Sequence, residues 1–157
     1  MPKSELIAKP NSHELTMIRV FNAPRDVVFK VMTDPKQIPN WWGPRDYTTI
    51  VDKMEVKSGG VWRYVQRGAD GSEFGFHGVY HSIVAPESII DTFEFEGMPG
   101  HVLMETTTLE SLPDGKTKLT VSSVFQTVED RDGMMSSGME GGANDSYDRL
   151  DEILAAL

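Results

Sequence analysis

The first candidates for chemistry are the four histidines of the chain, His13, His77, His81 and His101. Their spacing matches no helical metal-binding motif such as HExxH, so we expect no metal site. His77 and His81 fall on one face of an expected strand over residues 73–84. If that face lines a cavity, the imidazoles could act as acid, base or ligand donor. The alternative is that Phe76 and Tyr80 point inward and the histidines face solvent.

Carboxylates are the second group, because some share strand faces with apolar residues. Phe93 and Phe95 alternate with two glutamates, so the phenylalanines are expected to face inward, and Asp91 shares their phase. On the next strand, Leu103 and Glu105 fall on one face. If that face is the inner one, Glu105 is a carboxylate in an apolar cavity with a raised pKa and a candidate general base. If it is exposed or paired, no such role follows, and we assign no catalytic residue.

Other features exclude several kinds of site. The chain has no cysteine, which excludes disulfides, thiolate catalysis and cysteine-ligated metals. The segment SSGMEGG at 136–142 lacks the strand-turn-helix setting of a nucleophile elbow or a phosphate loop. With 15 Lys plus Arg against 24 Asp plus Glu, the net charge of -9 disfavours nucleic acid and anionic membranes as partners. We therefore expect no cofactor, no nucleic acid and no membrane partner.

The sequence also bears on location. No stretch approaches the roughly 18 apolar residues of a membrane span, and the start MPKSELIAKPNSHEL has no apolar core of a secretory signal. The expected location is the cytoplasm.

Residues 39–44 read PNWWGP and place two of the three tryptophans, Trp41 and Trp42, side by side. Adjacent side chains of a regular element point in different directions, so an irregular backbone must aim both rings. Two interpretations stay open: the pair is a structural plug, or one ring covers a cavity rim while the other packs on helices. Trp62 and Tyr64 share a strand face and are further wall candidates, and nine methionines suit a pliable pocket.

The spacing of apolar residues predicts the elements that position these side chains. Residues 13–21 alternate as a strand, and 22–34 carry apolar residues at helical spacing. Three prolines and a glycine in 35–44 permit at most one further helical turn. Six strands with turns such as Asp-Gly follow, and from 135 to 157 apolar residues recur every three or four positions as one long helix.

Together these elements predict an α+β fold. A curved antiparallel sheet should wrap around the long C-terminal helix, because a sheet of this size needs a cover for its apolar face. Two short helices should follow the first strand. We expect a single domain over 13–157, preceded by an N-terminal arm over 1–12.

Several strings resemble a known superfamily. APRDVVFKVMTDPKQIPNWWGP, SGGVWRY, GVYHSIVAPESII, PDGKTKLTV and GMEGGANDSYDRLDEIL stand in the order of the START-like, or SRPBCC, superfamily. Within it the chain is similar to the branch of the activator of heat-shock-protein-90 ATPase. The resemblance implies the helix-grip fold, also called birch-pollen-allergen-like, with a cavity that often holds a hydrophobic small molecule. It also implies a link to stress response, while members of the superfamily bind different things.

The terminal helix departs from this resemblance in one place. Family members often carry bulky aromatic residues where this chain has Met139 and Ala143, beside glycines at 138, 141 and 142. Each glycine within a helix costs roughly 0.5–1 kcal/mol relative to alanine. The small side chains would leave volume for a ligand, or else allow close packing or a kink at the helix start.

The strand phases and the resemblance together give the candidate cavity residues. They are Trp41, Trp42, Trp62, Tyr64, His77, His81, Phe93, Phe95, Glu105, Met135, Met139 and Ala143.

Three functions remain open. The first is a module that binds an apolar or aromatic small molecule between the sheet and the terminal helix. The second is a co-chaperone that stimulates a chaperone ATPase, with the chaperone as partner. The third is a cyclase or hydrolase using polar groups in the same cavity, which is the less favoured interpretation. Both a monomer and a homodimer are compatible with the sequence.

Overall fold

One curved sheet of eight antiparallel strands forms the body of the protein, in the order β1-β2-β8-β7-β6-β5-β4-β3. The computed structural model describes residues 4–157. The elements are β1 (Glu5–Ile7), β2 (Glu14–Phe21), α1 (Arg25–Met32), α2 (Ile38–Trp41), β3 (Thr48–Met54), β4 (Val61–Arg67), β5 (Glu73–Val84), β6 (Ser88–Phe95), β7 (Val102–Ser111), the 3-10 turn Pro113–Gly115, β8 (Thr117–Val124), α3 (Val128–Ser136) and α4 (Met139–Ala156).

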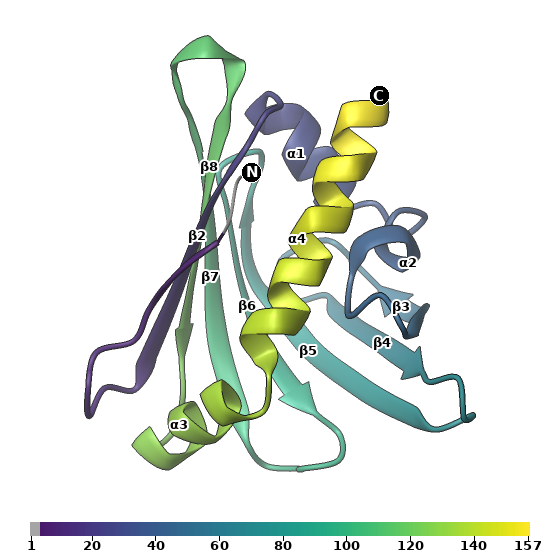
Figure 1. Cartoon of the computed structure of the whole chain (residues 1–157), viewed down its shortest axis with the longest axis vertical. Helices are drawn as coiled ribbons and strands as arrows, with labels where there is room; N and C mark the ends of the chain where they lie inside the picture. The colour runs from purple at the N-terminus through teal and green to yellow at the C-terminus, as the bar shows by residue number, and fades with distance from the viewer. Residues whose placement is uncertain (1–3) are drawn as a thin grey trace.

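The sheet curls around α4, which lies across its concave face (Figure 1). Strands β3 to β8 form a meander because short turns such as the one at Gly71, with a φ of 84°, join neighbouring antiparallel strands. The segment with α1 and α2 carries the chain from β2 to the opposite edge at β3. The expected grip of a sheet on the terminal helix, with two short helices after an early strand, is confirmed.

Alternation along the strands decides which side chains face α4. In β2 every second residue is buried, from Leu15 to Phe21. The register of β2 against β8 pairs Arg19 with Leu119, which is also buried. Arg19 itself is buried and donates from Nη2 to Asp148 and Asp151 of α4, at 2.7 and 2.5 Å. These ion pairs fix the C-terminal half of α4 over β2.

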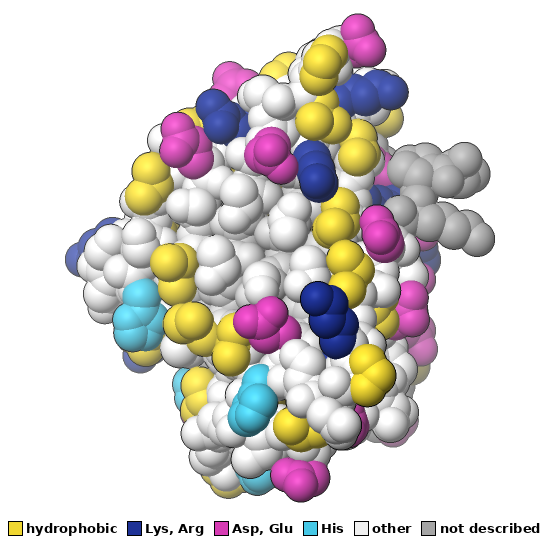
Figure 2. Space-filling model, turned by 90° about the vertical axis from the view of Figure 1, so that its left-hand side faces the viewer, with side chains coloured by type: hydrophobic (Ala, Val, Ile, Leu, Met, Phe, Trp, Pro, Cys, Tyr) yellow, Lys and Arg dark blue, Asp and Glu magenta, His cyan; other side chains and the backbone are white. Residues whose placement is uncertain are grey.

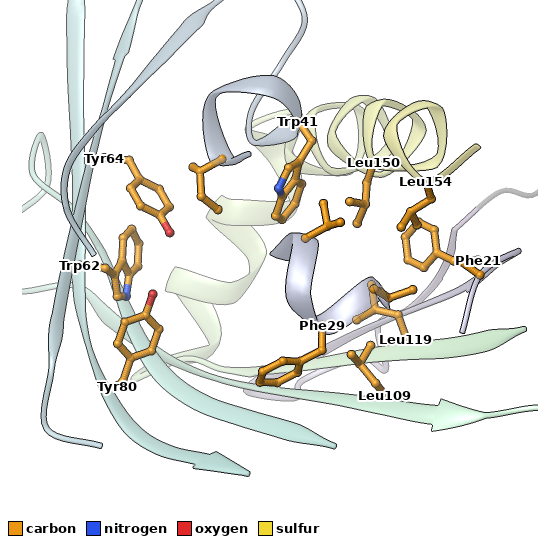
Figure 3. Packing of buried hydrophobic residues seen from close by; sticks show 14 residues of the cluster. Phe21, Phe29, Trp41, Trp62, Tyr64, Tyr80, Leu109, Leu119, Leu150 and Leu154 are labelled. Atoms are coloured by element: carbon orange, nitrogen blue, oxygen red, sulfur yellow. The ribbon is translucent and has the colours of Figure 1, made fainter. Parts of the chain in front are cut away.

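The packed part of the core lies under that half of the helix. Phe21, Leu119, Leu150 and Leu154 meet there, close to Leu109 and Phe29 (Figure 3). The aromatic residues of β4 and β5 lie on the other side of the view, with Trp41 between the two groups. The core is therefore filled at one end of the grip and aromatic at the other.

The terminal helix differs from the sequence prediction at its start. The apolar spacing from 135 predicted one helix, but α3 ends at Ser136 and α4 begins at Met139. Gly138 between them has a φ of 85°, a left-handed conformation that glycine adopts without a Cβ penalty. The chain is therefore kinked at Gly138, and only Gly141 and Gly142 lie inside α4.

Part of the expected N-terminal arm joins the sheet. Residues 5–7 of the predicted arm 1–12 form β1 and pair with β2 in an antiparallel register from Glu5 to Ile18. Residues 1–3 of the arm lie outside the described residues. Among residues 4–157, no helix is long and apolar enough to cross a bilayer.

Candidate functional site

A cavity of about 450 Å³ lies between the inner face of the sheet and the N-terminal half of α4. Its volume falls in the range of small-molecule sites. The described lining is mostly apolar and aromatic, with a few polar side chains: Met32, Thr33, Ile38, Trp41, Trp42, Gly43, Pro44, Met54, Trp62, Tyr64, Gln66, Phe76, Tyr80, Ile89, Asp91, Phe93, Leu103, Glu105, Thr107, Val121, Ser123, Phe125, Met134, Ser137, Gly138, Met139, Gly142, Ala143, Ser146 and Tyr147.

The cavity exists because α4 changes from small to large side chains along its length. Gly142, Ala143 and Ser146 face the cavity, whereas Leu150 and Leu154 fill the core two turns further on. A Cβ added to Gly142 would meet only the Pro44 ring, at 3.7 Å, so close packing does not require a glycine at that position. Small residues therefore leave space here instead of drawing the helix onto the strands.

An aromatic wall on β4, β5 and β6 closes one side of the cavity. Trp62, Tyr64 and Phe76 face inward, and the Trp42 ring meets all three edge-on, with centroid distances of 6.4, 5.0 and 5.4 Å. Phe93 packs on Phe76 at 5.5 Å. Such tilted and edge-to-face pairs hold the rings in fixed positions, so the wall has a defined shape.

The PNWWGP segment is held against α4 through its backbone. The Gly43 amide donates to Ser146 Oγ at 2.8 Å, and Arg149 donates to the carbonyls of Gly43 and Pro39, each at 3.1 Å. Thr49 Oγ1 donates to the Trp42 carbonyl at 2.6 Å. Gly43 has a φ of 95°, a conformation that favours glycine, and a Cβ there would also displace the Gln66 amide, whose Nε2 would lie 1.7 Å away.

Both tryptophans of this segment line the cavity, but in different settings. Trp41 is 5% exposed and belongs to the packed core, whereas Trp42 is half-buried and joins the aromatic wall. Trp42 is thus the more exposed of the two rings, and its role as a cover of the cavity stays a prediction. Together with Trp62, every tryptophan of the chain borders the cavity.

Two carboxylates lie next to each other in this apolar space. Asp91 on β6 and Glu105 on β7 are cross-strand partners, and both line the cavity. Tyr80 and Ser123 extend the same row, as the partners of Asp91 and Glu105 on β5 and β8. Partners directly opposite in a sheet share one face with neighbouring side chains, so the row is a polar strip across the inner face.

Burial changes the acidity of this strip. Loss of solvation raises the pKa of Glu105 to about 7. Loss of solvation, and then repulsion from Glu105, raise the pKa of Asp91 to about 8. Burial also raises the pKa of Tyr80 to about 12. Near neutral pH the carboxylate pair therefore holds both a proton and a negative charge, which is the arrangement of an acid beside a base.

Three buried donors of the lining have no hydrogen-bond partner in the described chain. They are Trp41 Nε1, Trp62 Nε1 and Gln66 Nε2. Trp62 lies near enough to Asp91 to lower its pKa slightly, without forming a hydrogen bond of good geometry. In Figure 3 the Trp41 indole nitrogen faces the side where Trp62, Tyr64 and Tyr80 lie. Buried donors are normally satisfied, so these groups are available to a guest in the cavity.

The two histidines expected in the cavity lie outside it. His77 is on the outer face of β5, where its ring nitrogens approach Glu96 at 2.8 Å and Glu94 at 3.3 Å. His81 is exposed. Phe76 and Tyr80 line the cavity from β5 instead. Gly78 shares their face, where a Cβ would lie 1.8 Å from the Thr92 carbonyl oxygen and 2.6 Å from Trp62 Nε1.

Two further candidates lie beside the cavity without lining it. Phe95 faces inward but packs on Phe74 and Phe76, at 6.2 and 5.2 Å, beyond the cavity border. Met135 is 36% exposed on α3, and its neighbour Met134 lines the cavity instead. The kink at Gly138 shifts the helical phase of α3 relative to α4, which explains why Met134 lines the cavity in place of Met135.

The remaining candidates are part of the cavity lining: Trp41, Trp42, Trp62, Tyr64, Phe93, Glu105, Met139 and Ala143. Residues that the candidate set lacked include Asp91, Tyr80 and Ser123. The sequence pattern indicated that Asp91 faces the same way as Phe93. The pairing of Asp91 with Glu105, however, depends on the register between β6 and β7. Within residues 4–157, no three acidic or histidine side chains gather as metal ligands.

Comparisons with known proteins agree with this architecture. The sequence pattern of the family described as Activator of Hsp90 ATPase homolog 1-like protein matches residues 22–155. A crystal structure from Rhodobacter sphaeroides is 26% identical, with a TM-score of 0.90 and 99% of each chain covered. A solution structure from Arthrobacter aurescens is 24% identical, with a TM-score of 0.88, covering 98% of this chain and 92% of the other. Among curated proteins, none matches this chain in sequence.

Proposed function

This chain belongs to the family of Activator of Hsp90 ATPase homolog 1-like proteins, and we propose that it binds an apolar, ring-containing small molecule in the cavity between its sheet and α4. The family commonly binds hydrophobic ligands. The observation that carries the proposal is the 450 Å³ cavity itself, walled by aromatic rings and left open by the small residues of α4.

The packing around the cavity supports the proposal. Side chains that border such a space make fewer dispersion contacts than side chains in a filled core. Gly142 and Ala143 are too small to fill this space, whereas two turns later the larger Leu150 and Leu154 fill the core. A guest that buries its rings against Trp62, Tyr64 and Phe93 would recover those contacts.

A fluorescence titration tests the proposal. N-phenyl-1-naphthylamine is a neutral apolar dye, and its emission should rise in a saturable one-to-one fashion with the wild-type protein. Ala143→Phe places a ring in the cavity and should abolish the rise. Gly141→Ala is the matched control, because Gly141 lies on the same helix with no neighbour near its Cβ direction and outside the lining. Equal binding by Ala143→Phe would contradict the proposal.

A second candidate, an acid-base enzyme, is favoured by the adjacent Asp91 and Glu105 carboxyls. A base that takes a proton from carbon beside a carbonyl, with an acid beside it, can exchange that proton without any co-reactant. Exchange of the α-protons of 2-tetralone in D2O, followed by NMR, tests this role. Faster exchange with wild type than with Asp91→Asn/Glu105→Gln supports it, and equal rates reject it.

Co-chaperone activity is supported by the family description alone. On the face seen in Figure 2, the described acidic, basic and apolar side chains are interspersed and form no uniform patch. An ATPase assay with the chaperone would decide this alternative.

A further inference from the structure

The charges that border the cavity are all of one sign. Asp91 and Glu105 are the only carboxylates in the described lining, which contains no lysine, arginine or histidine. Within residues 4–157, neither carboxylate has a cationic side chain within ion-pair distance. The negative charge that the pair holds near neutral pH therefore has no positive partner among the described residues that line the cavity.

Other titratable groups around the pair do not supply that charge. Tyr80 lies on the neighbouring strand β5, Tyr64 on β4 and Tyr147 on α4, and burial raises the pKa of each hydroxyl above its usual value. These phenols are therefore neutral at pH 7. Arg19, a buried cation on β2, is already engaged by the two aspartates of α4.

The rings beside the pair are suited to a cation. Phe93 stands two residues from Asp91 on the same strand face, and Tyr80 is the cross-strand partner of Asp91 on β5. Trp62 packs on Phe93 with a centroid distance of 6.0 Å. A cation over aromatic faces is attracted by the ring quadrupoles, most strongly where water is excluded.

A second and independent observation indicates a ligand rather than a merely acidic spot. Trp41 Nε1 and Gln66 Nε2 are buried in the lining and have no acceptor in the described chain. The two residues are 5% and 6% exposed. Both groups donate, so the guest that satisfies them carries an acceptor atom in addition to the group that faces the carboxylates.

From these contacts we propose that the natural ligand is a monovalent amine cation on a ring-containing apolar body, held by Asp91 and Glu105 and by the rings around them. An ether, hydroxyl or carbonyl oxygen on the same molecule would accept from Trp41 or Gln66. This inference rests on the proposed binding function and narrows its ligand class.

The test compares two probes of the same shape. Benzyltrimethylammonium and neopentylbenzene differ only in having a charged nitrogen or a neutral carbon at the branch. Quenching of tryptophan fluorescence reports occupancy, because all three tryptophans line the cavity. At pH 8 we expect the cation to bind at least about tenfold more tightly than the neutral probe.

Two variants separate local from general charge effects. In Asp91→Asn/Glu105→Gln the preference for the cation should disappear. In Glu87→Gln/Glu110→Gln, which removes two exposed carboxylates of the surface, it should persist. Circular dichroism melts establish that both variants are folded.

The outcomes also separate this inference from the proposed function. Equal or tighter binding of neopentylbenzene would overturn the inference while leaving the binding function in place. A cation preference that survives in Asp91→Asn/Glu105→Gln would overturn it too. If neither these probes nor the neutral dye binds, both proposals fall. Selectivity should also decline between pH 8 and pH 5, as the carboxylates become protonated; the probe itself does not titrate.

Discussion

Asp91 and Glu105 stand directly opposite each other on β6 and β7, with both side chains bordering the same cavity. Two acidic groups in an apolar space cannot both ionise easily, because each loses hydration and repels the other. The pair should therefore affect the stability of the protein, the pH dependence of that stability and the preference for a ligand.

The pH dependence of stability should reveal this pair. Burial raises the pKa values of Asp91 and Glu105 to about 8 and about 7, above the unfolded values near 4. The folded state thus binds protons more tightly than the unfolded state, and this contribution is complete below about pH 4 and is lost as the pH rises through 7 and 8. The free energy of unfolding of wild type, measured in urea, should fall between pH 5 and pH 9.

Asp91→Asn/Glu105→Gln provides the comparison for that measurement. The variant cannot ionise at these positions, so its stability relative to wild type should increase steadily from pH 5 to pH 9. Arg63 lowers the pKa of Glu96 to about 2, so that group titrates below this window. Parallel pH profiles for the two proteins would show that the carboxyls are well solvated.

The two adjacent tryptophans should respond differently to truncation. Trp41 is packed in the core, so Trp41→Ala should lower the free energy of unfolding by about 3–5 kcal/mol. Trp42 is half-buried on the aromatic wall, so Trp42→Ala should cost less stability and weaken dye binding more. Urea unfolding and dye titration of both variants test this; similar losses of stability would identify the pair as a structural plug.

Gly43 and Gly141 should respond in opposite directions to alanine. Gly43 has a φ of 95° and no room for a Cβ beside Gln66, so Gly43→Ala should destabilise the protein by more than about 1 kcal/mol. Gly141 lies inside α4 with open space around it, and Gly141→Ala should stabilise by about 0.5–1 kcal/mol. Thermal melts distinguish the two; destabilisation by Gly141→Ala would mean that α4 is not a regular helix there.

The buried Arg19 predicts an asymmetry between its own removal and that of its partners. Asp148→Asn/Asp151→Asn leaves a guanidinium buried without a counter-charge, and should cost about 3–5 kcal/mol. Arg19→Met keeps an apolar stem and frees two aspartates that are partly exposed, so its cost should be clearly smaller. Urea unfolding of the two variants gives the comparison, and a larger loss for Arg19→Met would contradict this account of the ion pairs.

The strands and the grip were predictable because they follow from local patterns. Alternation in β2 and the turn glycine Gly71 act over a few residues, and the structure confirms the architecture they imply. The break at Gly138 was harder to predict from the sequence, because the apolar spacing of 135 to 157 continues across it. Only the left-handed backbone of Gly138 separates the two helices.

The site was predictable only where the phase of a strand was clear. Phe93 alternates with charged residues, so its inward direction could be predicted. On β5 both faces carry aromatic or apolar residues, so the alternation alone did not show that Phe76 and Tyr80 line the cavity while His77 lies outside. The meeting of Asp91 with Glu105 depends on the register of two strands, which no single strand encodes.

The central claim is that a small molecule enters the cavity, and methyl NMR tests it most directly. With 13C-methyl methionine labelling and N-phenyl-1-naphthylamine, intermolecular NOEs should reach the methyls that line the cavity, Met32, Met54, Met134 and Met139. The exposed Met98, Met104 and Met135 serve as internal controls and should show none. NOEs confined to the exposed methionines, or no NOEs at saturating dye, would contradict the account.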